Sequence, residues 1–370
     1  MTSPRYTPLR DRHESLGASF TDFGGWAMPV RYSSELAEHR AVRTAAGLFD
    51  ISHMAEFFVS GPGAGEYLDY VLAGRLSTLP VGRAKYSLLL SERGGIVDDL
   101  IVYRLEEESF LVIANAGNRD AVAAALAAAA VGRGVTVVDA TDDHCLIAVQ
   151  GPAARAVLDA TVGLAQSASP LDELTYYAAT WASFEGQPVL IARTGYTGED
   201  GYELLIPNGS AAALWDAVLS AGAPFGLVPA GLAARDTLRL EAGMPLYGHE
   251  LSPDIVPAQV GLARVVAIDK DDFVGRTGLA AVVAADAPVL VGLAAEGKRA
   301  GRAGYAVLDA AGTAVGEVTS GALSPTLGHP IAMALVSPAH SSAGTELFID
   351  VRGTRVPATV TPLPFYRRTA

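Results

Sequence analysis

Two adjacent aspartates, Asp98 and Asp99, stand between a glycine turn and an apolar run in the stretch ERGGIVDDLIVYRL, residues 92–105. Two neighbouring carboxylates repel each other, and one of them lies at or near the start of a strand that carries its neighbours into a core. A carboxylate held at such a place could have a chemical role. The alternative is a solvated turn without a chemical role.

A second candidate is the stretch RTGYTGEDGYELLIP, residues 193–207. Its glycines Gly195, Gly198 and Gly201 recur every three residues, which permits tight turns or a close approach of the backbone to a ligand. The chain then enters a predicted strand that carries Glu203, whose carboxylate could accept two hydrogen bonds from adjacent N–H donors. The alternative is an irregular loop.

The helical stretch GLAARDTLRLEAGMPLYGHEL begins at Gly231 and carries two arginines. Arg235 and Arg239 are four residues apart and therefore share one face of the predicted helix. One of them could pair with Asp236 or Glu241 and have no other role, which is the usual fate of helical charges.

Other motifs give no support to common enzyme classes. In GPGAGE, residues 61–66, Glu66 stands where a dinucleotide fingerprint needs its third glycine, so we expect a helix-entry turn. The sequence contains no Walker motif, nucleophile elbow or His-Glu-x-x-His. We expect His39 and His53 to be structural or pocket-wall residues, and we expect no metal site.

Composition limits the partners and the compartment. A net charge of -13 with dispersed Lys and Arg argues against nucleic-acid binding. The polar N-terminus lacks the apolar segment of a signal peptide, and the apolar run 121–131 is about half the roughly 20 residues of a membrane helix. The single cysteine, Cys145, fits a reducing compartment. We therefore expect a cytoplasmic protein that does not cross a membrane.

At 370 residues the chain is long enough for two or three domains. The segments EFFVSGPGAGEYLDYVLAG and LIAVQGPAARAVLDATVG each predict a strand, a Gly-Pro turn and a helix, which suggests two related units. Strands and helices are mixed without strict alternation, so we predict an antiparallel α+β architecture. After about residue 285, short strands without a helix predict a small all-β domain, a barrel or a sandwich.

The motifs occur together in one known family. With FGGWAMPVRYSSELAEHRAVRTAAGLFDISHM and GEVTSGALSP, they make the chain resemble the aminomethyltransferases, the T-protein of the glycine cleavage system, from Phe23 to Tyr366. The resemblance implies a three-domain ring around a central folate funnel. Its predicted parts are a discontinuous α+β domain (1–50 and 146–270), a second α+β domain (51–145) and a C-terminal β-barrel (285–370).

The resemblance also implies a reaction. The family moves the methylene carbon from the aminomethyl-dihydrolipoyl arm of the H-protein to tetrahydrofolate, which gives 5,10-methylenetetrahydrofolate and ammonia without a metal. Asp98 matches the family's essential aspartate, beside the reacting folate nitrogens, and Asp99 would be structural.

The remaining site residues are likewise implied by the resemblance. Glu203 matches the carboxylate that receives the N–H donors of the pterin, and Arg235 matches an arginine of the folate site. Four further residues match the pocket wall: Tyr86, Met54, Asn115 and Tyr366.

Some positions depart from the family pattern. Gln259 replaces the usual Glu, and Arg264 replaces the usual Trp. These departures leave the one-carbon donor open, and the alternative is a tetrahydrofolate-dependent demethylase. A third possibility is a non-catalytic folate-binding protein of iron-sulfur assembly, but such proteins carry Lys-Gly-Cys-Tyr, whereas Leu146 follows Cys145 here.

Overall fold

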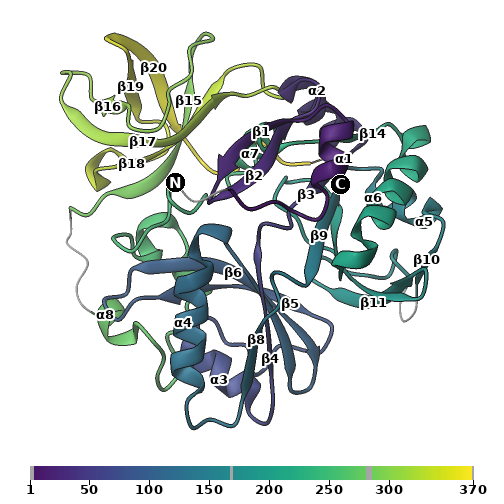
Figure 1. Ribbon diagram of the computed structural model, residues 1–370. Helices are drawn as coiled ribbons and strands as arrows, with labels where there is room; N and C mark the ends of the chain where they lie inside the picture. Colours follow the sequence, from purple (N-terminus) through teal and green to yellow (C-terminus); the bar gives the residue numbers. More distant parts are fainter. Residues whose placement is uncertain (1–3, 167–169, 281–285, 369–370) are drawn as a thin grey trace. The chain divides into compact units, whose positions relative to one another are not determined.

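The computed structural model describes residues 4–166, 170–280 and 286–368 (Figure 1). The chain forms two compact units. The first consists of Met1–Ser87 and Leu100–Arg235, and the second of Leu88–Asp99 and Asp236–Ala370.

A seven-stranded sheet is the centre of the first unit. Its order is β10 (Leu164–Gln166), β11 (Ala179–Phe184), β12 (Gln187–Ala192), β13 (Gly201–Pro207), β9 (His144–Gln150), β3 (Ala46–Asp50) and β14 (Leu227–Pro229). All neighbours are antiparallel except β3 and β14. Helices α5 (Ala154–Ala160) and α6 (Asn208–Gly222) contact each other and β13.

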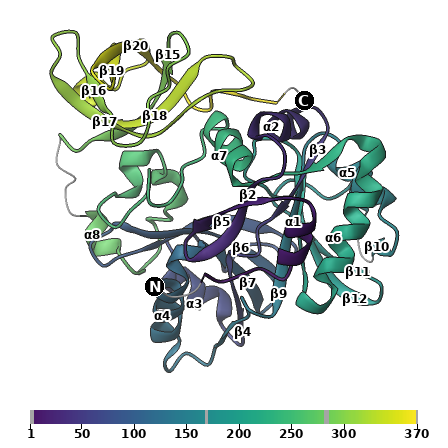
Figure 2. The same ribbon diagram turned by 45° about the horizontal axis from the view of Figure 1, so that its top comes forward.

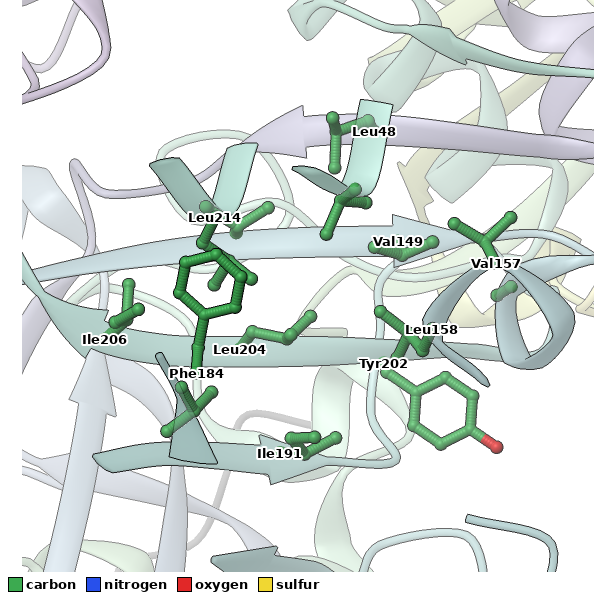
Figure 3. Packing of buried hydrophobic residues seen from close by; sticks show 14 of the residues in the cluster. Leu48, Val149, Val157, Leu158, Phe184, Ile191, Tyr202, Leu204, Ile206 and Leu214 are labelled. Atoms are coloured by element: carbon green, nitrogen blue, oxygen red, sulfur yellow. The ribbon is translucent and has the colours of Figure 1, made fainter. Parts of the chain in front are cut away.

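The apolar core of this sheet explains why apolar and polar side chains point to opposite faces of β13. On β13, Leu204 and Ile206 pack toward α6, whose Leu214 lies in the same apolar cluster (Figure 3). Side chains on a strand alternate between the two faces, so Glu203 lies on the opposite face. Each fully buried Leu or Ile contributes roughly 1.5–3 kcal/mol, and this burial fixes the register that presents Glu203.

A second, five-stranded sheet has the order β5 (Ala84–Leu90), β6 (Ile96–Glu106), β7 (Ser109–Ala114), β4 (Ala55–Ser60) and β8 (Thr136–Asp139). Helices α3 (Ala64–Val71) and α4 (Arg119–Ala130) contact each other, with α3 against β7 and α4 against β8. The remaining N-terminal elements are α1 (Arg10–Ser15), β1 (Ser19–Phe23), β2 (Trp26–Arg31) and α2 (Glu35–Thr44).

The predicted repeat of strand, Gly-Pro turn and helix occurs in both sheets, as β4–α3 and β9–α5. The turn glycines Gly61 and Gly151 have φ of 120° and 133°. A Cβ on either would lie within 2.8 Å of a backbone oxygen, of Gly134 and Ala45 respectively. Only glycine fits such a turn without strain, so the recurring glycine reflects one local solution used twice.

The C-terminal strands close into a barrel, so the barrel alternative is confirmed over the sandwich (Figure 2). Its order is β15 (Val289–Ala295), β18 (Pro330–Val336), β17 (Ala314–Leu323), β16 (Ala306–Leu308), β19 (Glu346–Val351) and β20 (Thr354–Thr361). Helix α8 (Arg276–Ala280) precedes the barrel, and α7 (Leu232–Glu241) precedes α8.

The mixed α+β sheets and the barrel confirm the predicted fold class. The predicted start of the barrel domain at residue 285 lies outside the described residues, and the first barrel strand begins at Val289. The domain boundaries and the central funnel stay predictions. Among the described helices, none is both long enough and apolar enough to cross a membrane.

Candidate active site

Glu203 on β13 is held through one of its two carboxylate oxygens. Thr194 Oγ1 donates to Glu203 Oε2 at 2.6 Å, and the Tyr103 hydroxyl lies 3.4 Å from the same oxygen. Tyr103 and Thr194 also contact each other, with their oxygens 3.1 Å apart. Within residues 4–166, 170–280 and 286–368, no hydrogen-bond partner is described for Oε1. The side chain is thus fixed in direction while one acceptor remains open.

A pocket lies beside this carboxylate, between the two sheets of the first unit. Its lining combines two polar side chains with six apolar ones: Tyr103, Glu203, Leu111, Ile113, Leu146, Leu190, Ala192 and Leu205. Burial raises the pKa of the Tyr103 phenol, and the charge of Glu203 raises it further, so the phenol stays protonated. The accessible volume is about 10 Å³, which is room for about one water molecule, so this is a small gap in the packing beside Glu203.

Arg235 supplies a half-buried cation to the same unit. Its guanidinium carbon lies 4.8 Å from the centre of the Tyr196 ring, a cation–π contact. Burial lowers the pKa of Arg235, while Glu203 and Tyr196 act in the opposite direction. Because arginine titrates so far above neutrality, the side chain remains charged and can face an anionic or electron-rich ligand.

His53 is a buried imidazole in the turn between β3 and β4. Only 2% of the residue is exposed, and its ring lies edge-on to Phe23 with centroids 5.3 Å apart. Burial and the positive charge of Arg235 lower the pKa of His53 to about 4, against an opposing effect of Asp50. The ring is therefore neutral at physiological pH. The prediction of a structural or pocket-wall role leaves open what its nitrogens bind.

Three residues predicted at the pocket wall also belong to the first unit. Met54 is half-buried and closes the turn after β3, where its N–H donates to Ile51 O at 3.1 Å. Asn115 follows β7, and its C=O accepts the Asn118 N–H at 3.0 Å. Tyr86 is half-buried on β5. These observations give the place of each residue in the fold. That each of them contacts a ligand stays a prediction.

Asp98 belongs to the second unit and is the third residue of β6. It is fully buried, whereas Asp99 is half-buried, as expected for side chains on opposite faces. Burial raises the pKa of Tyr247, and the charges of Asp98 and Asp99 raise it further. A buried carboxylate excludes the solvated-turn alternative for Asp98.

The glycines before Asp98 allow the strand to start where it does. A Cβ on Gly95 would lie 1.8 Å from Pro253 O, so this turn touches the backbone of another segment of the second unit. Ile96 N–H then donates to Ile255 O at 3.0 Å. Close approach at Gly95 thereby anchors the two-aspartate segment.

Tyr366 and Arg239 belong to the second unit, and Arg239 contacts the barrel motif GEVTSGALSP. The Tyr366 N–H donates to Glu241 O at 2.8 Å. Arg239 is buried and donates to Ser320 Oγ at 2.8 Å, to Glu250 at 3.2 Å and to Asp236 at 2.8 Å. The ion-pair alternative therefore holds for Arg239. Arg235, in the first unit, instead makes the cation–π contact with Tyr196.

Gln259 and Arg264, which depart from the family pattern, differ in their surroundings. Gln259 is buried, with Oε1 accepting the Val256 N–H and Nε2 donating to Pro288 O, both at 2.9 Å. The Gln259 side chain thus links the backbone at Val256 to the backbone at Pro288. Arg264 is exposed. Across the part of the chain that the structure describes, no group of three or more His, Cys, Asp or Glu residues could hold a metal ion.

Two family models cover most of the chain. Residues 9–270 match the GCVT N-terminal domain, and residues 289–367 match the glycine cleavage T-protein C-terminal barrel domain. The chain belongs to the glycine cleavage T-protein family. The family models therefore confirm the resemblance that the sequence motifs indicated.

Individual relatives match over their full length. Proteins named aminomethyltransferase from Cutibacterium acnes and Saccharopolyspora erythraea are 55% and 53% identical, with all of each chain covered. The crystal structure of the glycine cleavage system aminomethyltransferase T from Bartonella henselae is 39% identical, with a TM-score of 0.90 over 98% of both chains.

The sequence did not predict two partners of Glu203. Thr194 lies inside the glycine-rich motif, so its spacing of nine residues from Glu203 could have suggested it. Tyr103 is 100 residues away and comes from the other sheet, so only the fold brings it to the carboxylate. Neither residue carries a local signal of binding on its own.

Proposed function

We propose that this T-protein family member is an aminomethyltransferase that uses tetrahydrofolate as co-substrate and a lipoylated H-protein as partner. The observation that carries the proposal is the Glu203 carboxylate, which is fixed through Oε2 by Thr194 and open at Oε1. The full-length likeness to aminomethyltransferases supports it.

Folate suits this chemistry because its pterin ring is flat, mostly apolar on its faces, and carries neighbouring N–H donors on one edge. A carboxylate accepts such donors pairwise, and a charge-assisted hydrogen bond is stronger than a neutral one. Glu203 would therefore select the pterin edge.

The reaction breaks two bonds to one carbon and forms two others. The C–N bond to the amine and the C–S bond to the lipoyl sulfur break, while two C–N bonds to folate form. The two protons displaced from the folate nitrogens end on ammonia and on the thiol, so atoms and charge balance.

Asp98 is proposed as the catalytic carboxylate of this reaction. A buried carboxylate can orient a weakly nucleophilic folate amine, accept its proton and stabilise iminium character at the carbon. Burial strengthens these effects, because interactions between charges grow as the local dielectric falls.

A cytoplasmic location is part of the proposal. It rests on the lone thiol of Cys145, which is buried and free, as expected for a protein of a reducing compartment.

The test is ammonia release and methylenetetrahydrofolate formation from aminomethyl-loaded H-protein, with and without tetrahydrofolate. We expect folate-dependent turnover that Asp98→Asn lowers by about 100-fold or more, in the range typical of general acid–base catalysis. Folate affinity should stay within roughly tenfold, about 1.4 kcal/mol.

Asp99→Asn is the matched control, because it removes the neighbouring charge from the same strand and should keep most turnover. If the wild type binds folate but releases no ammonia, the aminomethyl donor is wrong, and a methylated small-molecule donor for a demethylase becomes the next substrate to assay. Unchanged turnover in Asp98→Asn would remove the catalytic role of that residue alone.

A further inference from the structure

The glycine-rich loop between β12 and β13 closes around one buried side chain, that of Gln150. Gln150 is the last residue of β9, and only 1% of it is exposed. A Cβ on Gly201 would lie 2.5 Å from the Gln150 amide carbon and nitrogen, and a Cβ on Gly195 would overlap the same amide. Neither glycine has a positive φ. The loop therefore needs these two glycines because they leave room for Gln150.

Both ends of the Gln150 amide form hydrogen bonds with this loop. Its Nε2 donates to Thr194 O at 3.1 Å, and its Oε1 accepts the Thr197 hydroxyl at 3.0 Å. A side-chain amide carries a donor on one side and an acceptor on the other, and the two loop groups match them. Gln150 is thus joined to the loop by hydrogen bonds as well as by shape.

Thr194 is the residue of this loop that reaches Glu203. It lies two residues past the end of β12, where the ladder between β12 and β13 no longer holds the chain. Its hydroxyl donates to Glu203 Oε2 at 2.6 Å, and its C=O accepts the hydrogen bond from Gln150. The direction of the Thr194 hydroxyl therefore depends on how Gln150 holds the Thr194 backbone.

The far part of the loop has a separate support. Arg43 of α2 donates to Thr197 O at 2.7 Å and pairs with Glu199 at 2.9 Å, and both side chains of this ion pair are buried. Breaking a buried ion pair is costly, so this part of the loop is firmly held. We therefore expect the loop to stay folded when the Gln150 amide is lost, with the largest change at Thr194.

We propose that Gln150 is a positioning residue for folate binding: it fixes the backbone of Thr194, whose hydroxyl in turn directs the Glu203 carboxylate toward the ligand. This proposal rests on the proposed function, because it takes folate as the ligand of Glu203. Gln150 acts through Thr194 and does not itself touch the substrate. The proposal gives the recurring glycines of the loop a function, since a side chain at Gly195 or Gly201 would displace the amide.

The test is calorimetric binding of 5-methyltetrahydrofolate, a folate that cannot accept the one-carbon unit. Gln150→Met keeps the length of the side chain but has no N–H to donate to Thr194. We expect it to bind the folate about three- to tenfold more weakly, as for the loss of one hydrogen bond. In steady-state assays it should raise the KM for tetrahydrofolate more than it lowers kcat, because Glu203 is proposed to bind the ring and not to transfer protons.

A double-mutant cycle with Thr194→Val tests the route. Valine keeps the backbone C=O that Gln150 binds but lacks the hydroxyl that Glu203 accepts. We expect Gln150→Met to lower the denaturation midpoint in both backgrounds. Its effect on folate affinity should fall below about twofold once Thr194 is replaced, because coupled residues are not additive. A purely structural role of Gln150 would give the same factor with and without the Thr194 hydroxyl.

Gly201→Ala reaches the same amide from the other side, and it keeps the proposal testable if Gln150→Met does not fold. The added Cβ must displace the Gln150 amide, so folate binding should weaken by a similar factor. Thr161→Val is the control, because it removes a buried hydroxyl that donates to Val157 O at 2.8 Å at the end of α5. It should lower the denaturation midpoint and leave folate affinity unchanged.

Wild-type affinity in both Gln150→Met and Gly201→Ala would overturn the proposal, and so would wild-type affinity in Thr194→Val alone. An equal loss for Gln150→Met in both backgrounds of the cycle would also overturn it, because Gln150 would then act on binding by a route other than Thr194. If the wild type itself does not bind the folate, the proposed function fails, and the positioning role of Gln150 fails with it.

Discussion

Two carboxylates of the first unit, the buried Asp50 and the half-buried Glu203, have opposite hydrogen-bond environments. Asp50 receives donors on both oxygens: Thr7 and His13 on Oδ2, and the hydroxyl and N–H of Ser52 on Oδ1. Glu203 has two hydroxyl groups on Oε2 and an open Oε1. The difference separates a carboxylate that holds the fold together from one that is prepared for a ligand.

The position of each carboxylate in the fold explains the difference. Asp50 ends β3 next to the apolar cluster around Trp215, and it joins α1 to the sheet through His13. Glu203 lies on the other face of the sheet, toward the second sheet and the pocket. A carboxylate buried between a helix and a sheet must have all its hydrogen bonds made, whereas one that binds a ligand needs a free acceptor.

The largest expected effect concerns Asp50. Asp50→Ala should lower the free energy of unfolding by about 3 to 5 kcal/mol, because it leaves several buried donors unpaired. Urea denaturation measures the change. Asp216→Ala, which removes an exposed partner of Arg12, serves as the control and should change stability little. A loss at Asp50 no larger than in this control would mean that the saturated network does not hold the fold.

Glu203→Gln should show the reverse pattern, with a large effect on ligand binding and a small one on stability. The amide can still accept from Thr194, but it presents an N–H₂ group where the ligand donors would lie. We expect folate affinity to fall by about 1 to 3 kcal/mol, roughly 6- to 150-fold, by calorimetry.

Thr194→Val is the companion variant for Glu203. It removes the strongest donor to Oε2 and leaves Oε1 in place, so it should weaken binding less than Glu203→Gln does. If Glu203→Gln binds folate as tightly as the wild type, the open oxygen has no role in binding, and the contrast with Asp50 loses its functional meaning.

The sequence predicted those features of the site that depend on local pattern. The motif around Asp98 and Asp99 predicted a strand that begins at or near these residues, and the glycine-rich loop predicted the strand that carries Glu203. The Gly-Pro turns predicted two strand–helix units, because close backbone contact at Gly61 and Gly151 excludes a side chain.

Features that depend on pairing across the fold could not be predicted. Tyr103 reaches Glu203 from a different sheet, and His13 reaches Asp50 from an N-terminal helix. The sequence around His53 carries no signal that shows whether its Nδ1 has a hydrogen-bond partner. Only the packed structure shows that His13 is saturated and His53 is not.

The comparison also predicts the dependence of stability on pH at the acid side. Burial alone would raise the pKa of Asp50, but hydrogen bonds and charge from His13, with Ser52 and Thr7, lower it overall. A lowered folded-state pKa gives stability that is present above the unfolded pKa and lost as pH falls through the folded value. Denaturation midpoints should therefore fall in acid for the wild type, and Asp50→Asn should flatten this limb. An equally steep acid limb in the variant would assign it to other carboxylates.

Glu56, six residues after Asp50, completes the comparison with the smallest expected effect. Both of its carboxylate oxygens are buried, with no hydrogen-bond partner in the described parts of the chain. Burial raises the pKa of Glu56 well above its usual value, and the charge of Asp139 adds to this against the effect of Arg119. The native state therefore keeps a proton that the unfolded chain releases above about pH 4.3.

A raised folded-state pKa gives stability that is complete below the unfolded pKa and is lost as pH rises toward the folded value. Glu56→Gln keeps the shape but cannot ionise, so its free energy of unfolding should depend less on pH and exceed that of the wild type by about 1 kcal/mol near pH 8. Urea denaturation from pH 5 to 8 measures this difference. If the two proteins keep a constant offset over that range, Glu56 does not carry the extra proton, and the contrast between a saturated and an unsaturated buried carboxylate has no consequence for stability.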